Sequence, residues 1–181
     1  ALRILNEAAS AVETLEDSAT KGRYHTILAV ALKRMGGNEN LDRALIEYTA
    51  ASFHFEQAGH IAYYASGENN ISSLLLEFRR YEDAHQHLDN AYNAFTRLRD
   101  LPRAAQTFET RARIFIAQGR YKEAQRAAAT AVKTLEKGSE QALLAEALTT
   151  SAIALARLQQ HGRALTVFSQ AAQVATQAGD T

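Results

Sequence analysis

The stretch Gly119–Ala124 reads Gly-Arg-Tyr-Lys-Glu-Ala, and its last five residues have a counterpart 40 residues earlier, where Arg80–Ala84 reads Arg-Tyr-Glu-Asp-Ala. Shifting the whole chain by 40 residues against itself aligns further positions without a gap. Four of the resulting columns are Leu41, Tyr81, Tyr121 and His161; Ala44, Ala84, Ala124 and Ala164; Tyr48, Leu88, Ala128 and Phe168; and Ala51, Ala91, Ala131 and Ala171. Because successive columns lie three or four residues apart, they share one face of a helix. The pattern predicts a chain of helical repeats.

A fifth column in this helix extends the register, and a second helix precedes it. The fifth column holds Leu15, Phe55, Phe95, Leu135 and Ala175, and the register also reaches back to Ala1, Ile4, Ala8 and Ala11. The preceding helix is marked by the columns Met35, Leu75, Phe115 and Leu155 and, seven residues earlier, Leu28, Glu68, Phe108 and Leu148. Each repeat is therefore predicted to be a pair of helices.

Stacking of such pairs predicts an all-α, right-handed solenoid of about nine helices in antiparallel pairs. We expect helices at 1–17, 21–35, 41–58, 61–78, 81–98, 101–118, 121–137, 140–158 and 161–178. Residues 1–181 then form a single solenoid with a half repeat at 1–17 and full repeats at 21–58, 61–98, 101–137 and 140–178. The start within a repeat, without an initiating Met, predicts that the chain is a fragment of a longer protein.

The composition excludes several classes of function. The 181 residues include no Cys, which removes disulfides, Cys-based metal sites and thiol nucleophiles. The apolar runs are too short to cross a bilayer, and the formal net charge is zero, so we expect a cytoplasmic protein without a membrane partner. Phosphate-binding, nucleophile-elbow and His-Glu-x-x-His motifs are absent from the sequence. We therefore expect no enzymatic activity, no catalytic residues, no cofactor and no metal.

The quoted stretches resemble the Gly-x-Tyr-x-x-Ala turn and second helix of the tetratricopeptide repeat. The period of 40 is similar to the extended form of this repeat in kinesin light chains, cell-polarity adaptors and bacterial regulators. Other stretches, such as Ala44–Tyr48 and Ala145–Thr149, resemble solenoid regions of bacterial signalling and transcription-regulatory proteins. HEAT repeats are the structural alternative at this length, but they lack this turn. The departures are Glu39, Arg79 and Gln159 in place of the turn Gly, and His161 in place of the turn Tyr.

The resemblance implies a peptide-binding groove lined by the first helix of each repeat. The family's groove positions fall here on Ser66, Asn69, Asn70, Ser73 and Glu77; Gln106, Glu109, Thr110, Arg113 and Ala117; and Glu146, Thr149, Thr150, Ile153 and Arg157. Asn69 and Asn70 are the foremost candidates, because paired amides hydrogen-bond an extended peptide well and are unfavourable in a helix. The alternative is that Asn70 bonds a neighbouring helix. Glu109 and Arg113 are four residues apart and are expected to pair.

Charged residues elsewhere allow further interpretations. Segment 38–90 holds nine acidic and three basic residues, and segment 96–137 holds ten basic and four acidic ones. We expect the basic segment to meet an acidic peptide or to pair with the adjacent acidic repeat rather than to bind nucleic acid, because stacking aromatics are not interleaved with it. The cluster Glu82, Asp83, His85, His87 and Asp89 is interpreted as a solvated outer face, with a metal site as the alternative. Glu68 and Arg111 interrupt apolar columns, which predicts a buried ion pair between them or, alternatively, contact with a ligand.

Two functions fit these features. The first is a noncatalytic scaffold that binds a protein or peptide segment in the concave groove, as the interaction region of a larger bacterial protein. The second is a sensor solenoid that binds a small ligand or signalling peptide and controls an attached output domain, such as one that binds DNA.

Overall fold

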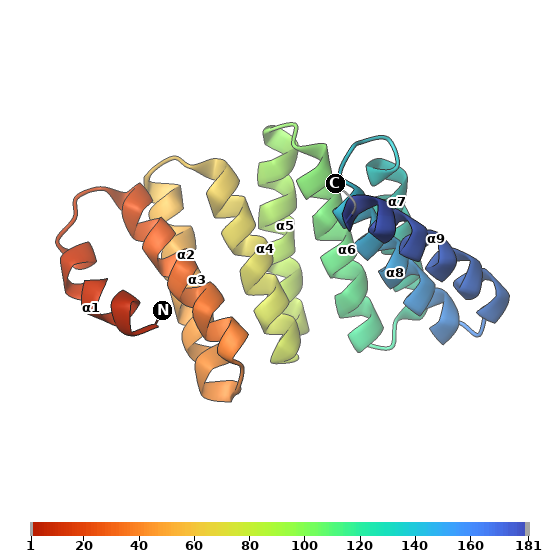
Figure 1. Ribbon diagram of the computed structural model, residues 1–181, viewed down its shortest axis with the longest axis horizontal. Coiled ribbons are helices and arrows are strands. Elements are labelled where there is room, and N and C mark those ends of the chain that lie inside the picture. Colours follow the sequence, from red (N-terminus) through yellow and green to blue (C-terminus); the bar gives the residue numbers. More distant parts are fainter. Residues whose placement is uncertain (1, 180–181) are drawn as a thin grey trace.

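The computed structural model describes residues 2–179, and these form a curved row of antiparallel helices (Figure 1). In chain order the helices are α1 (Leu2–Glu13), α2 (Ser18–Met35), α3 (Asn38–Gln57), α4 (Ile61–Glu77), α5 (Tyr81–Arg97), α6 (Leu101–Ala117), α7 (Tyr121–Leu135), α8 (Gln141–Arg157) and α9 (His161–Gly179). Their bounds agree with the expected ranges to within four residues. Residue 1, where the first helix was expected to begin, and residues 180–181 lie outside the described residues. The all-α solenoid expected from the sequence is confirmed.

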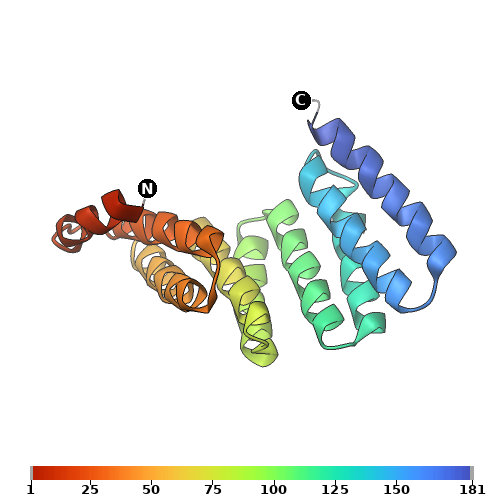
Figure 2. The same cartoon turned by 60° about the horizontal axis from the view of Figure 1, so that its bottom comes forward.

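The helices pack as consecutive pairs. The most extensive contacts join α2 to α3, α4 to α5, α6 to α7 and α8 to α9, and each second helix then packs on the first helix of the following pair. Seen from a second direction, the row bends, so that the helix axes at its two ends point in different directions (Figure 2). No helix in the described part of the chain combines the length and apolar character needed to span a bilayer.

Small side chains at the repeat columns set the spacing within the stack. Ala44, Ala84 and Ala124 are completely buried, as are Ala51, Ala91 and Ala131 two helical turns further along the same face. An alanine methyl allows the neighbouring helix to approach closely, and larger side chains such as Leu88 and Phe95 fill the remaining space. The core therefore runs the length of the row rather than lying at one centre.

Several turns between helices contain a residue in the left-handed region. The sharp turns place Arg79, Gly119 and Gln159 at φ of 58°, 73° and 62°, respectively. In each turn the next residue donates its backbone N–H to a carbonyl five residues earlier, as in Arg120 N to Phe115 O at 2.8 Å. This is the Schellman arrangement, which Gly adopts without strain and other residues adopt at a cost. Arg79 and Gln159, which replace the turn Gly, thus keep the turn geometry, but their backbones are strained by the positive φ.

Replacing one of these strained residues by glycine is expected to stabilise the protein. Arg79 is exposed, so Arg79→Gly removes the clash of Cβ without removing a packed side chain. We expect the free energy of unfolding to rise by about 1 kcal/mol, measured by chemical denaturation. The matched control is Gly119→Ala, where a new Cβ meets no atom within 4 Å and only the positive φ opposes it. That variant should lose about 1 kcal/mol, and a loss of stability in Arg79→Gly would contradict this account of the turn.

Candidate functional site

The first helices of the pairs form the inner layer of the stack. α4 contacts α6, and α6 contacts α8, whereas no contact of that extent joins successive second helices in the described residues. In a curved stack, neighbours lie closest on the inner side. The first helices therefore line the concave face, on which the groove positions were expected.

Two hydrogen bonds between neighbouring first helices cross this face. Thr110 Oγ1 donates to Asn69 Oδ1 at 3.2 Å, and one repeat further Thr150 Oγ1 donates to Glu109 Oε1 at 2.7 Å. All four side chains are buried. Asn69 therefore links α4 to α6. The sequence had suggested such a structural contact with a neighbouring helix as the alternative role of Asn70, not of Asn69.

A pocket of about 580 Å³ lies on the concave face between α6, α8 and the C-terminal part of α9. Five of the expected groove residues line it, namely Glu109, Arg113, Glu146, Thr149 and Thr150. The rest of the lining is formed by Ala142, Ala145, Ala175 and Ala178. Polar groups that the sequence placed on separate helices thus converge on one apolar-walled hollow.

Glu109 is the buried charge of this pocket, with 7% of its surface exposed. Burial raises the pKa of its carboxyl, and the nearby Glu146 acts in the same direction, against the Thr150 hydrogen bond and the charge of Arg113. The expected Glu109–Arg113 pair is wrong, because the described residues contain no ion pair within 4 Å between them and Glu109 instead accepts from Thr150. Arg113 is exposed and remains available to a ligand.

The remaining groove positions lie at different depths. Ser66 and Ser73 donate their hydroxyls to carbonyls of their own helix, at 3.0 Å and 3.2 Å. Asn70 and Gln106 are half-buried, and the exposed members of the set are Glu77, Arg113, Ala117, Glu146, Thr149 and Arg157. The face thus offers a row of accessible polar groups, and the pocket near α9 lies along it.

The expected ion pair between Glu68 and Arg111 is wrong. Glu68 is buried and accepts from Ser52 Oγ at 2.7 Å, Asn90 Nδ2 at 2.8 Å and His87 Nδ1 at 2.9 Å. Arg111 instead pairs with Asp89 of α5 at 2.6 Å. Asp89 is two residues from His87, about 200° around the helix, so α5 contacts Glu68 and Arg111 with side chains on different sides.

Burial raises the pKa of the Glu68 carboxyl, but hydrogen bonds from His87, Asn90 and Ser52 together outweigh burial and hold that pKa below its usual value. The charged form of Glu68 is therefore stabilised by the fold. Because donors come from α3 and α5 while Glu68 lies on α4, this carboxylate ties three helices together.

The histidines of α5 were wrongly assigned to a solvated outer face. His87 holds Glu68, and His85 is half-buried with its ring centroid 5.0 Å from that of Phe115. Burial lowers the pKa of His85, with Arg111 and Arg120 nearby. In the described residues, no group of three or more His, Asp or Glu side chains converges as a metal site requires.

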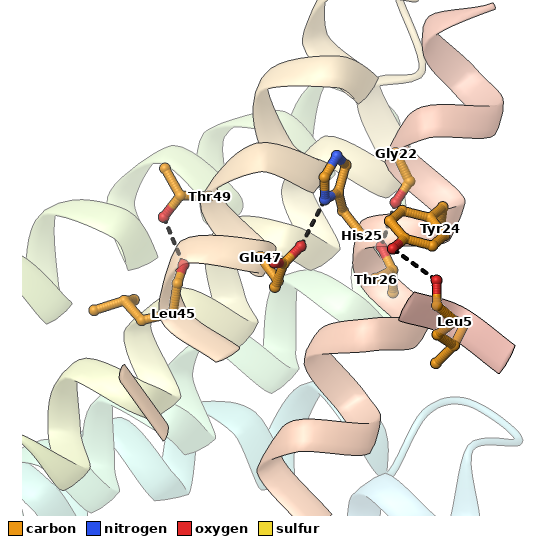
Figure 3. Close-up of polar contacts among 8 residues, drawn as sticks. All are labelled: Leu5, Gly22, Tyr24, His25, Thr26, Leu45, Glu47 and Thr49. Atoms are coloured by element: carbon orange, nitrogen blue, oxygen red, sulfur yellow. Dashed lines mark hydrogen bonds and ion pairs between the residues drawn. The ribbon is translucent and has the colours of Figure 1, made fainter. Parts of the chain in front are cut away.

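Sequence reasoning missed a second, smaller pocket between α1, α2 and α3. Its volume is about 210 Å³, and its polar lining includes Lys21, His25, Glu47 and His54. His25 Nδ1 lies 2.6 Å from Glu47 Oε2, and the neighbouring Tyr24 donates its hydroxyl to the Leu5 carbonyl at 3.0 Å. Figure 3 shows both contacts as dashed lines. The sequence did contain a signal for this pocket, namely a histidine at a repeat position that is otherwise alanine. The positions equivalent to His25 hold Ala65, Ala105 and Ala145.

The fold can be compared with solved structures. BtubC (BKLC) from P. vanneervenii superposes with a TM-score of 0.80 at 17% identity, covering 99% of this chain and 73% of that one. Aspartyl phosphate phosphatase F from Bacillus subtilis gives a TM-score of 0.86 at 15% identity, covering 99% of this chain and 46% of that one. A putative kinesin light chain from Podosopora anserina with TPR-like repeats gives 0.70 at 13% identity, covering 99% of this chain and 85% of that one.

The fold is that of the tetratricopeptide-like repeat proteins. No protein-family model matches the sequence, and no curated protein is significantly similar to it. The tetratricopeptide-like stack explains why the pocket lies where it does, because first helices occupy its concave face in each pair.

The Glu68 contacts predict an acid-sensitive stability. Because the pKa of Glu68 is lowered in the folded state, its contribution is complete above the ordinary glutamate pKa of about 4.3 and is lost as the pH falls through the folded value. Glu68→Gln should lower the free energy of unfolding by about 1 to 3 kcal/mol at pH 7. The deficit should shrink below about pH 4.3, measured by denaturation at several pH values.

The matched control for this prediction is Glu77→Gln, which changes an exposed glutamate of the same helix. It should shift stability by less than about 0.5 kcal/mol. A Glu68→Gln deficit that stays constant down to pH 3 would show that the carboxylate charge is not what holds α3, α4 and α5 together.

Proposed function

We propose that this chain is a noncatalytic scaffold that binds a protein or peptide segment along the first helices α4, α6 and α8. The observation that carries the proposal is the pocket of about 580 Å³ between α6, α8 and α9, in which Glu109, Arg113 and Glu146 converge between alanine methyls. Ligand sites combine an apolar hollow with a few polar groups that orient the ligand, and this pocket has that composition. No histidine lies among the residues that line it, so a nucleophile–histidine pair is absent from the lining.

The row of accessible polar side chains suits an extended peptide. Asn70 on α4 is half-buried, and its amide offers both donor and acceptor groups to a peptide backbone. Arg113 and Glu146 follow on α6 and α8, and Arg157 lies at the end of α8. A peptide that lies across these helices would meet a donor or acceptor on each of them, with one side chain in the pocket.

The proposed setting is the interaction or regulatory region of a larger bacterial protein. This chain spans 64% of RapI, solved in its apo form, with a TM-score of 0.84 at 17% identity, and under half of aspartyl phosphate phosphatase F. A similar helical stack is therefore one part of longer proteins. A link to signalling or transcription, and a cytoplasmic location, belong to this proposal and agree with the bacterial regulators that the sequence resembles.

A peptide selection tests the binding proposal. Selection from a random heptapeptide library on the purified chain should yield binding peptides. When such a peptide is added, the amide NMR signals of the chain that shift should belong to α4, α6 and α8. Asn70→Ala combined with Arg113→Ala should weaken a selected peptide about tenfold or more, because desolvated contacts at the centre of an interface carry most of its energy. The melting temperature should stay nearly unchanged, since Asn70 is only half-buried and Arg113 is exposed.

The matched control is Arg126→Ala, which removes an exposed arginine from the second helix α7. It should leave the affinity for the selected peptide within about twofold of the parent. Peptides that bind Asn70→Ala with Arg113→Ala as tightly as the parent chain, or that shift only residues of second helices, would reject the concave face as the binding surface.

A sensor role is the second candidate, and the packing of α9 favours it. α9 has only Ala164 and Ala171 buried among its described residues, and its extensive contacts there are with α8 alone. Ala175 and Ala178 of α9 line the pocket, so a ligand would contact both α8 and the less anchored α9. A bound peptide should then change the small-angle scattering profile of the chain by drawing α9 inward. An identical profile with and without the peptide favours the rigid scaffold.

A further inference from the structure

The charges in the concave pocket are unbalanced. Glu109 and Glu146 line it with a single cation, Arg113, and the described residues contain no ion pair within 4 Å among these three. One repeat earlier, the positions of Glu109, Arg113 and Glu146 are occupied by the uncharged Asn69, Ser73 and Gln106. The acidic character therefore belongs to this end of the groove and not to the repeat as such.

Glu109 has an unused acceptor in the pocket wall. Its Oε1 accepts from Thr150, whereas its Oε2 accepts no hydrogen bond from the described residues. The residue is more than nine-tenths buried, and burial raises the pKa of its carboxyl. A buried carboxylate with a single donor is poorly stabilised, in contrast to Glu68, which has three donors. A cationic group entering the pocket would provide what Glu109 lacks.

The space in the pocket comes from a change in a packing column. Ala175 occupies the column that holds Leu15, Phe55, Phe95 and Leu135 in the other repeats. Phe95 and Leu135 are buried, but Ala175 is exposed and borders the pocket together with Ala142, Ala145 and Ala178. These methyl groups form an apolar wall leading to Glu109. An aliphatic stem with a charged end fits such a wall, as lysine and arginine side chains do elsewhere.

We propose that the pocket takes a lysine or arginine side chain of the bound segment, with its charged end between Glu109 and Glu146 and its methylenes against the alanines. This inference rests on the proposed peptide-binding function and adds the chemical class of the recognised side chain. Arg113 is exposed at the same pocket, where its donors are free for carbonyl oxygens of the peptide.

Three model peptides separate charge from shape. The probes are acetyl-Ala-Ala-Xaa-Ala-Ala-amide with lysine, norleucine or glutamate as Xaa, titrated to millimolar concentration while amide NMR shifts of the chain are followed. The lysine peptide should shift residues of α6, α8 and the end of α9. Norleucine has the same stem without the charge and should bind about tenfold or more weakly, and glutamate should produce no shifts at the pocket.

Three variants test the pocket itself. Glu146→Gln changes an exposed side chain and should weaken the lysine peptide severalfold without affecting folding. Glu109→Gln should weaken it about tenfold or more, because the charge opposite the ammonium is lost. Ala175→Leu restores the size found in the other repeats and should abolish the shifts at the pocket while leaving both carboxylates in place. The matched control, Glu136→Gln, removes an exposed charge outside the pocket and should bind like the parent.

The outcomes distinguish this inference from the proposed function. Equal binding of the lysine and norleucine peptides at the pocket would overturn the selection for a cation and leave peptide binding on the concave face in place. Unchanged lysine-peptide affinity in both Glu146→Gln and Glu109→Gln would also overturn it. If selected heptapeptides bind α4 and α6 but no peptide shifts the pocket residues, the cation site is wrong while the scaffold stands. If no peptide binds the concave face, both fail.

Discussion

Close approach of paired helices is the constraint on which the rest of this structure depends. Ala44, Ala84 and Ala124 are completely buried at equivalent points of successive pairs, and any larger side chain there would push two backbones apart. Because the same contact recurs every 40 residues, each pair is held mainly by its neighbours rather than by one central core. A position outside these columns can then change without disturbing distant pairs. This tolerance lets individual repeats carry different polar groups on the same backbone frame.

Two buried carboxylates illustrate how the frame separates stability from binding. Glu68 and Glu109 both lie on first helices, and both are less than a tenth exposed. Three donors surround Glu68 and lower its pKa, so its charge is already compensated by α3 and α5. Glu109 has one donor and a raised pKa, so its charge is compensated only in part. The first is a structural tie among helices, and the second retains the capacity to interact with a ligand.

The sequence predicted the helices well because hydrophobic periodicity is a local property. The 40-residue register places Ala84 and Leu88 on a buried face, and both are buried. Partner choice among polar side chains was not predictable to the same extent. The register shows that Glu68 and Arg111 interrupt apolar columns, but not that α5 lies between them and offers His87 to one and Asp89 to the other. Such pairings depend on side-chain direction across two helices, which periodicity alone does not specify.

The concave pocket arises from the same columns that build the stack. Five of the groove positions carried over from the repeat converge because α6 and α8 are adjacent first helices, which the register implies; these are Glu109, Arg113, Glu146, Thr149 and Thr150. The hollow between them follows from Ala175, where the column loses the bulk that Leu135 retains one repeat earlier. A departure in a core column normally weakens packing. On α9, whose corresponding face is exposed, the loss of volume instead leaves room beside an incompletely compensated carboxylate, and a structural position becomes part of a binding surface.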